Sequence, residues 1–224
     1  SRNHYRQMSP SKILDKILEL VAAYRAAKAV KRKKVKNLKK VAICVGHSRI
    51  GDKGATSVGG VDEWSYNKKV ADLLKSHLRH QGVQSVVFDD YPSESYSGAM
   101  DWLGQSIAKE KCDIAIELHF NSYSSSKAEG YEYLYYHTSN NGRRLAECFR
   151  EAHAETFKVQ SDRGIKPIES DGRGGGFLRS VPPPAVICEP FFGSCPKEWI
   201  LFDVKHSLLA DVYAQAITSY FKNA

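Results

Sequence analysis

The sequence predicts a single α/β domain with a mostly parallel, twisted sheet flanked by helices, preceded by a basic N-terminal helical segment. From residue 40 on, short apolar runs alternate with helical patterns, which is typical of a parallel sheet covered by helices. The length of 224 residues fits one domain with an appendage. Residues 1–40 carry 13 Lys or Arg and 2 Asp or Glu, whereas residues 41–224 carry 20 and 23. We therefore expect a basic arm or linker over residues 1–39 and the domain over residues 40–224.

The N-terminal segment has the pattern of a basic amphipathic helix. Ser9 and Pro10 are typical of a helix start, and apolar residues recur at helical spacing as far as Tyr24. The stretch from Lys28 to Lys40 holds eight basic residues in thirteen. Two interpretations remain open: a solvated tether, or an arm over residues 1–40 that binds an anionic envelope surface. Nucleic acid is the less favoured partner, because no nucleic-acid-binding fold accompanies the charge.

The elements of the domain follow from apolar spacing and from helix stop signals. Three leucines and Val70 share one face of the first expected helix, and Gly82 ends it. Gly and Pro residues concentrate between residues 160 and 183, which favours loops there. The expected elements are, in order, a strand over 41–45, a helix over 62–81, a strand over 83–88, a helix over 98–110, strands over 114–118 and 130–136, a helix over 142–157, loops with one short element over 160–183, a strand over 185–188 and a helical stretch over 197–222.

Composition excludes several classes of protein. The apolar runs are far shorter than the ~18 residues of a membrane span, so we expect no transmembrane segment. We see no secretory signal pattern, and the five cysteines form no CxxC pair, which argues against a disulfide framework. These features favour synthesis in the cytoplasm. We also expect the protein to be a monomer.

Polar residues stand where three of the expected strands end. His47 follows the first strand, His119 follows the strand over 114–118, and Glu189 follows the strand over 185–188. Glu63 stands at the start of the first helix of the domain. Ligands of α/β sheets bind beyond the carboxyl ends of the strands, so these four side chains should meet. Each residue alone has a structural interpretation, such as a turn residue or a helix-terminus carboxylate, and the inference depends on their shared position.

Such a set has the composition of a catalytic zinc site. Three nitrogen or oxygen ligands hold the metal there, and a fourth position is left for water. His47, Glu63 and His119 would be the ligands, and Glu189 would be the general base that takes a proton from that water. The chemistry of this arrangement is hydrolysis of an amide or ester.

Residues 40–222 resemble the zinc-dependent N-acetylmuramoyl-L-alanine amidases of the amidase-3 type. The motifs that carry the resemblance are Gly46-His47, Asp52–Ala55, Glu63 before a long helix, Leu118–Ser122, Phe177–Arg179 and Pro184–Phe192. The resemblance implies zinc on His47, Glu63 and His119, with Glu189 as the catalytic acid/base. It also implies cleavage of the amide between the lactyl group of N-acetylmuramic acid and the L-alanine of the stem peptide.

Three further residues are candidates for contacts with a ligand or with the substrate. Asn121 and Arg179 belong to the matching motifs. Glu117 stands where the family usually has a small polar residue, and strand alternation places it on the same face as His119. Glu117 could orient a metal ligand or be a mere neighbour. The Gly-rich stretch over 172–176 is expected to be a flexible wall of the cleft.

The leading hypothesis is a zinc hydrolase that degrades the peptidoglycan of the cell wall. Small size, the lack of a visible signal and the basic segment favour a bacteriolytic, antimicrobial enzyme of the phage endolysin type; an autolysin domain is the alternative within this class. Two alternatives from other classes remain. One is another zinc amidohydrolase or carboxypeptidase that acts on small acyl-amino acids, although the sequence lacks a His-x-x-Glu pair at His47. The other is a non-catalytic envelope-binding module, against which the complete set of four site residues argues.

Overall fold

Six strands form one sheet in the order β2-β1-β3-β6-β4-β5. The strands are β1 (Lys40–Val45), β2 (Gln84–Phe88), β3 (Ile114–Leu118), β4 (Tyr131–Tyr136), β5 (Asp162–Ile168) and β6 (Ala185–Glu189). The first four in the sheet order are parallel to one another, and β4 pairs with β6 in the antiparallel direction. β5 in turn runs parallel to β4. The expected α/β domain with a mostly parallel sheet is therefore confirmed.

The computed structural model describes Ile17, Leu20, Tyr24 and residues 38–93 and 95–223. The basic helical arm expected over residues 1–39 thus lies almost wholly outside the described residues. Residues 39–224 form one compact unit. No helix in the described ranges is both long enough and apolar enough to cross a membrane.

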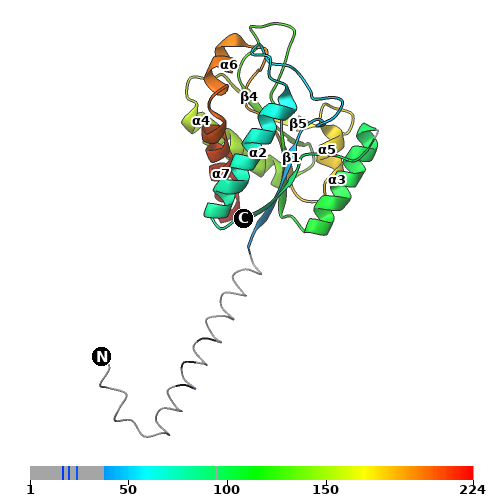
Figure 1. Cartoon of the computed structure of the whole chain (residues 1–224), viewed down its shortest axis with the longest axis vertical. Helices are drawn as coiled ribbons and strands as arrows, with labels where there is room; N and C mark the ends of the chain where they lie inside the picture. The colour runs from blue at the N-terminus through cyan, green and yellow to red at the C-terminus, as the bar shows by residue number, and fades with distance from the viewer. Residues whose placement is uncertain (1–16, 18–19, 21–23, 25–37, 94, 224) are drawn as a thin grey trace, which may run out of the picture. The chain divides into compact units, whose positions relative to one another are not determined.

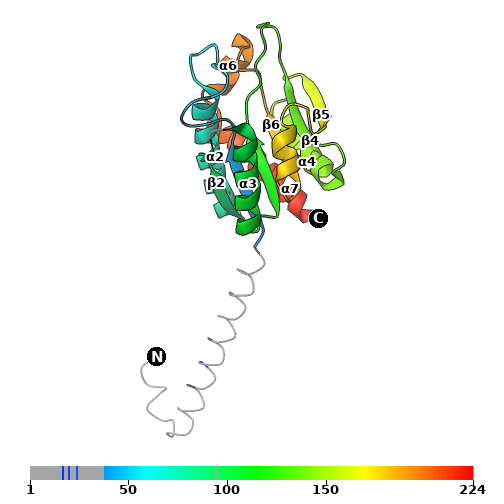
Figure 2. The same ribbon diagram turned by 90° about the vertical axis from the view of Figure 1, so that its right-hand side faces the viewer.

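Helices cover both faces of the sheet (Figure 1). They are α2 (Glu63–His80), α3 (Tyr96–Glu110), α4 (Asn140–Thr156), α5 (Gly175–Ser180), α6 (Pro196–Phe202) and α7 (His206–Lys222). α2, α4 and α7 pack on one face, where α7 contacts both α2 and α4, while α3 and α5 pack together on the other. Figure 2 turns the α3 and α5 face toward the viewer.

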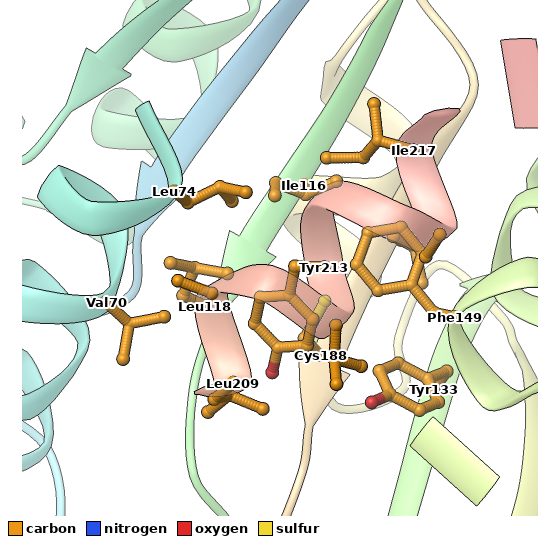
Figure 3. Close-up of a cluster of buried hydrophobic side chains, with 14 of the residues drawn as sticks. Val70, Leu74, Ile116, Leu118, Tyr133, Phe149, Cys188, Leu209, Tyr213 and Ile217 are labelled. Atoms are coloured by element: carbon orange, nitrogen blue, oxygen red, sulfur yellow. The ribbon is translucent and has the colours of Figure 1, made fainter. Parts of the chain in front are cut away.

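The alternation of side chains along β1 explains why a sheet with two covered faces forms here. Val41, Ile43 and Val45 enter the core under α2 and α7, whereas Ala42 and Cys44 enter the core under α3. All five side chains are fully buried, as expected for a central strand of a parallel sheet. Figure 3 shows how side chains of α2, α4 and α7 meet those of β3, β4 and β6 in the larger core.

Polar caps fix the starts of the long helices. Asp62 accepts a hydrogen bond from the backbone N–H of Ser65 at the start of α2. Ser95 and Ser139 cap α3 and α4 in the same way. Each such cap satisfies a backbone donor that has no partner within the helix and contributes about 1 kcal/mol. The cap at Asp62 matters for the site, because Glu63 is the first residue of α2.

Two expectations about the elements were incomplete. The stretch over 160–183 holds both β5 and α5, not one short element. β5 was missed because it contains Gly164, which weakens a strand, and Pro167, which is tolerated here because β5 is an edge strand. The helical stretch over 197–222 is two helices, α6 and α7. No glycine or proline marks the break between α6 and α7. At the end of α6, the Tyr66 hydroxyl of α2 donates a hydrogen bond to the Phe202 carbonyl, and local sequence does not reveal such a tertiary contact.

Candidate metal centre and its cleft

Three potential metal ligands converge from three separate elements. His47 follows β1, His119 follows β3, and these two strands are neighbours in the sheet. Glu63 reaches them from the first turn of α2, with Oε2 3.2 Å from His47 Nε2 and Oε1 2.8 Å from His119 Nδ1. One ligand atom from each residue lies within 4.8 Å of the other two. One small cation could therefore contact all three.

The electrostatics of this cluster suit a cation. Burial alone would raise the pKa of the Glu63 carboxyl, but hydrogen bonds from His119 and His47 lower it to about 2. Burial would likewise lower the pKa of His119, yet hydrogen bonds to Glu117 and Glu63 raise it well above its usual value. Carboxylates thus hold protons on imidazoles that would otherwise be neutral. A metal ion can displace such protons, because histidine binds metal in its neutral form.

Glycines allow the backbone to approach the ligand side chains closely. A Cβ atom on Gly46 would lie 2.2 Å from the His119 ring. A Cβ atom on Gly54 would lie 2.5 Å from His47 Cδ2 and 2.7 Å from Glu63 Oε2. His47 itself has a φ of 67°, a left-handed conformation that is rare for residues other than glycine. Backbone strain of this kind persists where the surrounding structure enforces it, and it concentrates at functional sites.

Replacement of Gly54 by alanine is expected to weaken metal binding as well as the fold. Gly60→Ala is the matched control, because Gly60 has nearly the same φ, 77° against 79°, and a Cβ atom added there would meet nothing within 4 Å. Both variants should lose about 1–2 kcal/mol of stability from the left-handed conformation. Only Gly54→Ala should also lower the affinity for zinc, measured by competition with a chelating dye. Equal zinc affinities of the two variants would contradict a steric role of Gly54.

Glu189 is the buried carboxylate beside this cluster. It ends β6, and only 6% of its surface is exposed. Its Oε2 atom is buried and has no hydrogen-bond partner among the described residues. Burial raises the pKa of the Glu189 carboxyl to about 7. A carboxyl group in this state can both accept and return a proton near neutral pH.

One cleft of about 780 Å³ joins these groups. His47, Glu63, His119 and Glu189 all line it. Its size is that of a small-molecule or peptide site, and its walls mix apolar and polar side chains. The three residues at the strand ends and Glu63 at the start of α2 therefore meet in one place, as their positions in the sequence indicated.

The three secondary candidates have different outcomes. Glu117 lines the cleft, and its Oε2 lies 3.2 Å from His119 Nε2. Asn121 also lines the cleft and donates a hydrogen bond to Glu132 Oε1. Arg179 does not line this cleft but two smaller pockets. On α5 the buried positions are taken by Phe177 and Leu178, and Arg179 is exposed, so its contact with the substrate stays a prediction.

Sequence reasoning missed Arg173 and Glu132. Arg173 lines the cleft from the loop before α5, and its Nη2 lies 2.8 Å from Glu132 Oε1 on β4. The Gly-rich stretch around Arg173 is closely packed, because a Cβ atom on Gly174 would lie 2.2 Å from Ile187 Cδ1. The stretch therefore forms a closely packed wall of the cleft at this point. The one signal in the sequence was a charged residue, Glu132, within a strand that otherwise consists of tyrosines and one leucine.

The turn after β6 is braced by a second buried carboxylate. Glu198 of α6 accepts hydrogen bonds from the backbone N–H groups of Gly130 and Phe192. Gln160 donates to Glu198 and to the carbonyl of Pro190. These contacts fix the chain that immediately follows Glu189 and thereby limit the positions that its carboxylate can take.

Comparisons with known proteins agree with this geometry. The amidase-3 family model, described as N-acetylmuramoyl-L-alanine amidase, matches residues 41–219. The fold is similar to the CwlD amidase of Clostridioides difficile in complex with the GerS lipoprotein, at 19% identity and a TM-score of 0.74, covering 83% of this chain and 100% of that one. It is also similar to an N-acetylmuramoyl-L-alanine amidase of Clostridium difficile 630 (25% identity, TM-score 0.71, 83% and 98% covered). A third similar structure is the catalytic domain of an endolysin targeting Clostridia difficile (24%, 0.68, 81% and 97%). Curated proteins give no significant match.

Proposed function

We propose that this chain, which belongs to the N-acetylmuramoyl-L-alanine amidase family, is a zinc-dependent enzyme that hydrolyses the amide between the lactyl group and the L-alanine of peptidoglycan. Membership of the family bears out the resemblance noted in the sequence. One observation carries the finer proposal: the cluster of His47, Glu63 and His119 shares a cleft with the buried carboxylate of Glu189. Metal ligands and a proton acceptor are the two components that metal-assisted amide hydrolysis needs.

The donor set fits zinc better than other common metals. Two imidazole nitrogens and one carboxylate oxygen are the ligand types of many catalytic zinc sites, whereas calcium and magnesium prefer oxygen ligands alone. Three protein ligands leave a fourth position for water. Bound zinc would lower the pKa of that water and polarise the scissile carbonyl. The protein would supply His47, Glu63 and His119 as its ligands.

Glu189 would move the proton. Its carboxylate would accept a proton from the attacking water and return it to the amine of the leaving L-alanine. The lone pairs of Oε2 are not engaged by any hydrogen bond within the described chain, so they are available to that water. The bracing of the following turn by Glu198 would hold the carboxylate in position.

Glu117 would position His119. Its carboxylate lies at the Nε2 side of the ring, which leaves the Nδ1 atom, 2.8 Å from Glu63, to face the metal. A carboxylate on the second nitrogen of a metal-binding histidine fixes the tautomer and the ring orientation. Asn121 contacts Arg173 and Glu132 and not the three ligands, so we assign it the role of holding the cleft wall.

The test of the proposed function is mass spectrometry of the fragments that the zinc-loaded protein releases from purified peptidoglycan. Stem peptides with a free N-terminal L-alanine are expected, and they should disappear when the zinc is chelated. Intact sacculi with the native, zinc-loaded protein would contradict the proposal. Small acylated amino acids would then be the substrates to try, since a related zinc amidohydrolase could act on them.

In the cell-wall context, we propose a lytic role of the endolysin type, with residues 1–39 as a basic arm that binds an anionic envelope surface. The excess of basic residues before residue 41 supports the arm. Removal of residues 1–38 is expected to reduce lysis of whole cells at low salt and to leave the hydrolysis of purified peptidoglycan unchanged. Turbidity and fragment assays run on the same preparations measure both. Loss of activity on purified peptidoglycan would instead make the segment part of the catalytic domain.

A further inference from the structure

The cleft contains a fixed positive charge that the proposed chemistry does not use. Among the described residues that line the cleft, Arg173 is the only Lys or Arg, whereas Asp52, Glu63, Glu117 and Glu189 are acidic. The side chain of Arg173 is 56% exposed, so it is accessible to a ligand in the cleft. A ligand with a free carboxylate would find its one strong partner on this wall at Arg173.

The guanidinium is held in place by buried partners. Arg173 Nη2 lies 2.8 Å from Glu132 Oε1, and Nη1 donates to Asn121 Oδ1 at 3.0 Å. Asn121 also donates to Glu132, and both side chains are only 5–6% exposed. Two of the five N–H donors of Arg173 are therefore engaged in these bonds, which leaves others for a ligand. A group fixed in this way loses little entropy when a ligand binds, which favours affinity.

The carboxylates beside Arg173 leave part of its guanidinium open to a ligand. Glu132 is shared by two guanidiniums, because Arg163 Nε lies 3.0 Å from its Oε2 atom. Glu189 is the second carboxylate near Arg173, and its Oε1 lies 3.7 Å from Nη2, within ion-pair range but beyond hydrogen-bond distance. A ligand carboxylate could therefore form a hydrogen-bonded charge pair with Arg173.

The position of Arg173 selects which carboxylate can reach it. Glu132 and Glu189 are directly paired across the antiparallel strands β4 and β6, so Arg173 lies next to the carboxylate that would activate the attacking water. An extended chain advances about 3.3–3.6 Å per residue, so the residue after the leaving L-alanine lies within about 7 Å of the scissile nitrogen. Carboxylates farther along the stem peptide lie about 10 Å or more away.

We propose that Arg173 is a specificity-determining residue that binds the α-carboxylate of the second residue of the stem peptide. This inference rests on the proposed amidase function. In peptidoglycan that position carries either a free α-carboxylate or a carboxamide. A carboxamide cannot form the charge-assisted pair with a guanidinium, so the protein should prefer the acid form.

The test compares two disaccharide-tetrapeptides that differ only in a carboxylate or a carboxamide at the second stem residue. The zinc-loaded protein is expected to hydrolyse the acid with a kcat/KM about 10- to 100-fold higher, the range of one hydrogen-bonded charge pair. Arg173→Gln should reduce this ratio to near one, and Arg173→Lys should retain part of it. Arg163→Gln is the matched control. Arg163 is the other guanidinium that pairs with Glu132, but it does not line the cleft, so its replacement should leave the ratio unchanged.

The outcomes separate this inference from the proposed function. If the zinc-loaded protein hydrolyses neither substrate, the amidase proposal is overturned, and with it the assignment of Arg173. Hydrolysis of both at equal rates overturns the assignment of Arg173 alone. A ratio that survives Arg173→Gln, or an equal fall in rate on both substrates, also overturns it, because Arg173 would then act elsewhere or only through Glu189. Thermal unfolding of all variants shows whether each is folded.

Discussion

Replacement of Glu189 by glutamine is expected to lower kcat by about 10²- to 10⁴-fold, the usual contribution of a positioned general base. Glutamine has nearly the same shape but cannot accept the proton of the attacking water. Because Glu189 is not one of the three clustered ligands, zinc content should be unchanged. The measurement is the rate of L-alanine amine release, with bound zinc determined on the same samples. A variant that retains zinc and more than a tenth of the activity would exclude Glu189 as the base.

The Glu189→Gln variant should also differ from the parent protein in how its free energy of unfolding depends on pH. In the metal-free protein the pKa of Glu189 is raised from 4.5 to about 7 by burial, so the folded state binds the proton more tightly than the unfolded state. The protonated Glu189 carboxyl therefore contributes to the stability of the folded state. This contribution is complete below pH 4.5 and is lost as the pH rises through 7. Glu189→Gln lacks it, so the stability of the variant relative to the metal-free parent should rise between pH 5 and 8, by up to about 3 kcal/mol. Urea unfolding at the two pH values measures it, and a constant difference would contradict the raised pKa.

Loss of the metal or of a ligand carboxylate is expected to have an effect of similar size. Chelation should abolish activity and lower the melting temperature, since a ligand at 1,000 times its Kd contributes about 4 kcal/mol to stability. Glu63→Gln should weaken zinc binding most, because Glu63 contacts both histidines. Glu117→Gln should weaken it about 10- to 100-fold, the range for a carboxylate that orients a ligand histidine.

The control for these variants is His77→Gln. His77 is a half-buried histidine of α2 that pairs with Asp211 and lies outside the cleft. Its replacement should leave zinc affinity unchanged, as measured by chelator competition. Zinc affinity should also rise with pH, because the ion must displace protons that Glu63 and Glu117 hold on His119. An affinity that is unchanged by Glu63→Gln would place the metal elsewhere.

The position of the candidate site could be predicted because its residues obey a rule of topology. His47 and His119 follow β1 and β3, and Glu189 ends β6. These three strands are parallel neighbours, so their carboxyl ends meet at one edge. Apolar runs fixed these strands in the sequence, and their ends were placed to within a residue or two. Glu63 lies beside them because the Asp62 cap starts α2 at that point.

Arg173 and Glu132 show where local patterns fail. Arg173 reaches the cleft only because Gly174 allows its loop to pack on Ile187 of β6, a contact between segments that are distant in sequence. Glu132 faces Glu189 because β4 enters the sheet in the antiparallel direction, and no motif marks that reversal.

The reversal of β4 separates the residues at this edge of the sheet into two groups, which are carried by different segments of the chain. All four groups of the proposed chemistry come from β1, β3, β6 and the start of α2. Glu132 and Arg173, the ion pair that presents the guanidinium, come from β4 and from the loop between β5 and α5. Selection for a new host wall could therefore alter the second part while the reaction itself is conserved. For protein engineering, the segment from β5 to α5 is the one to exchange when the aim is to redirect such an enzyme to a different bacterium.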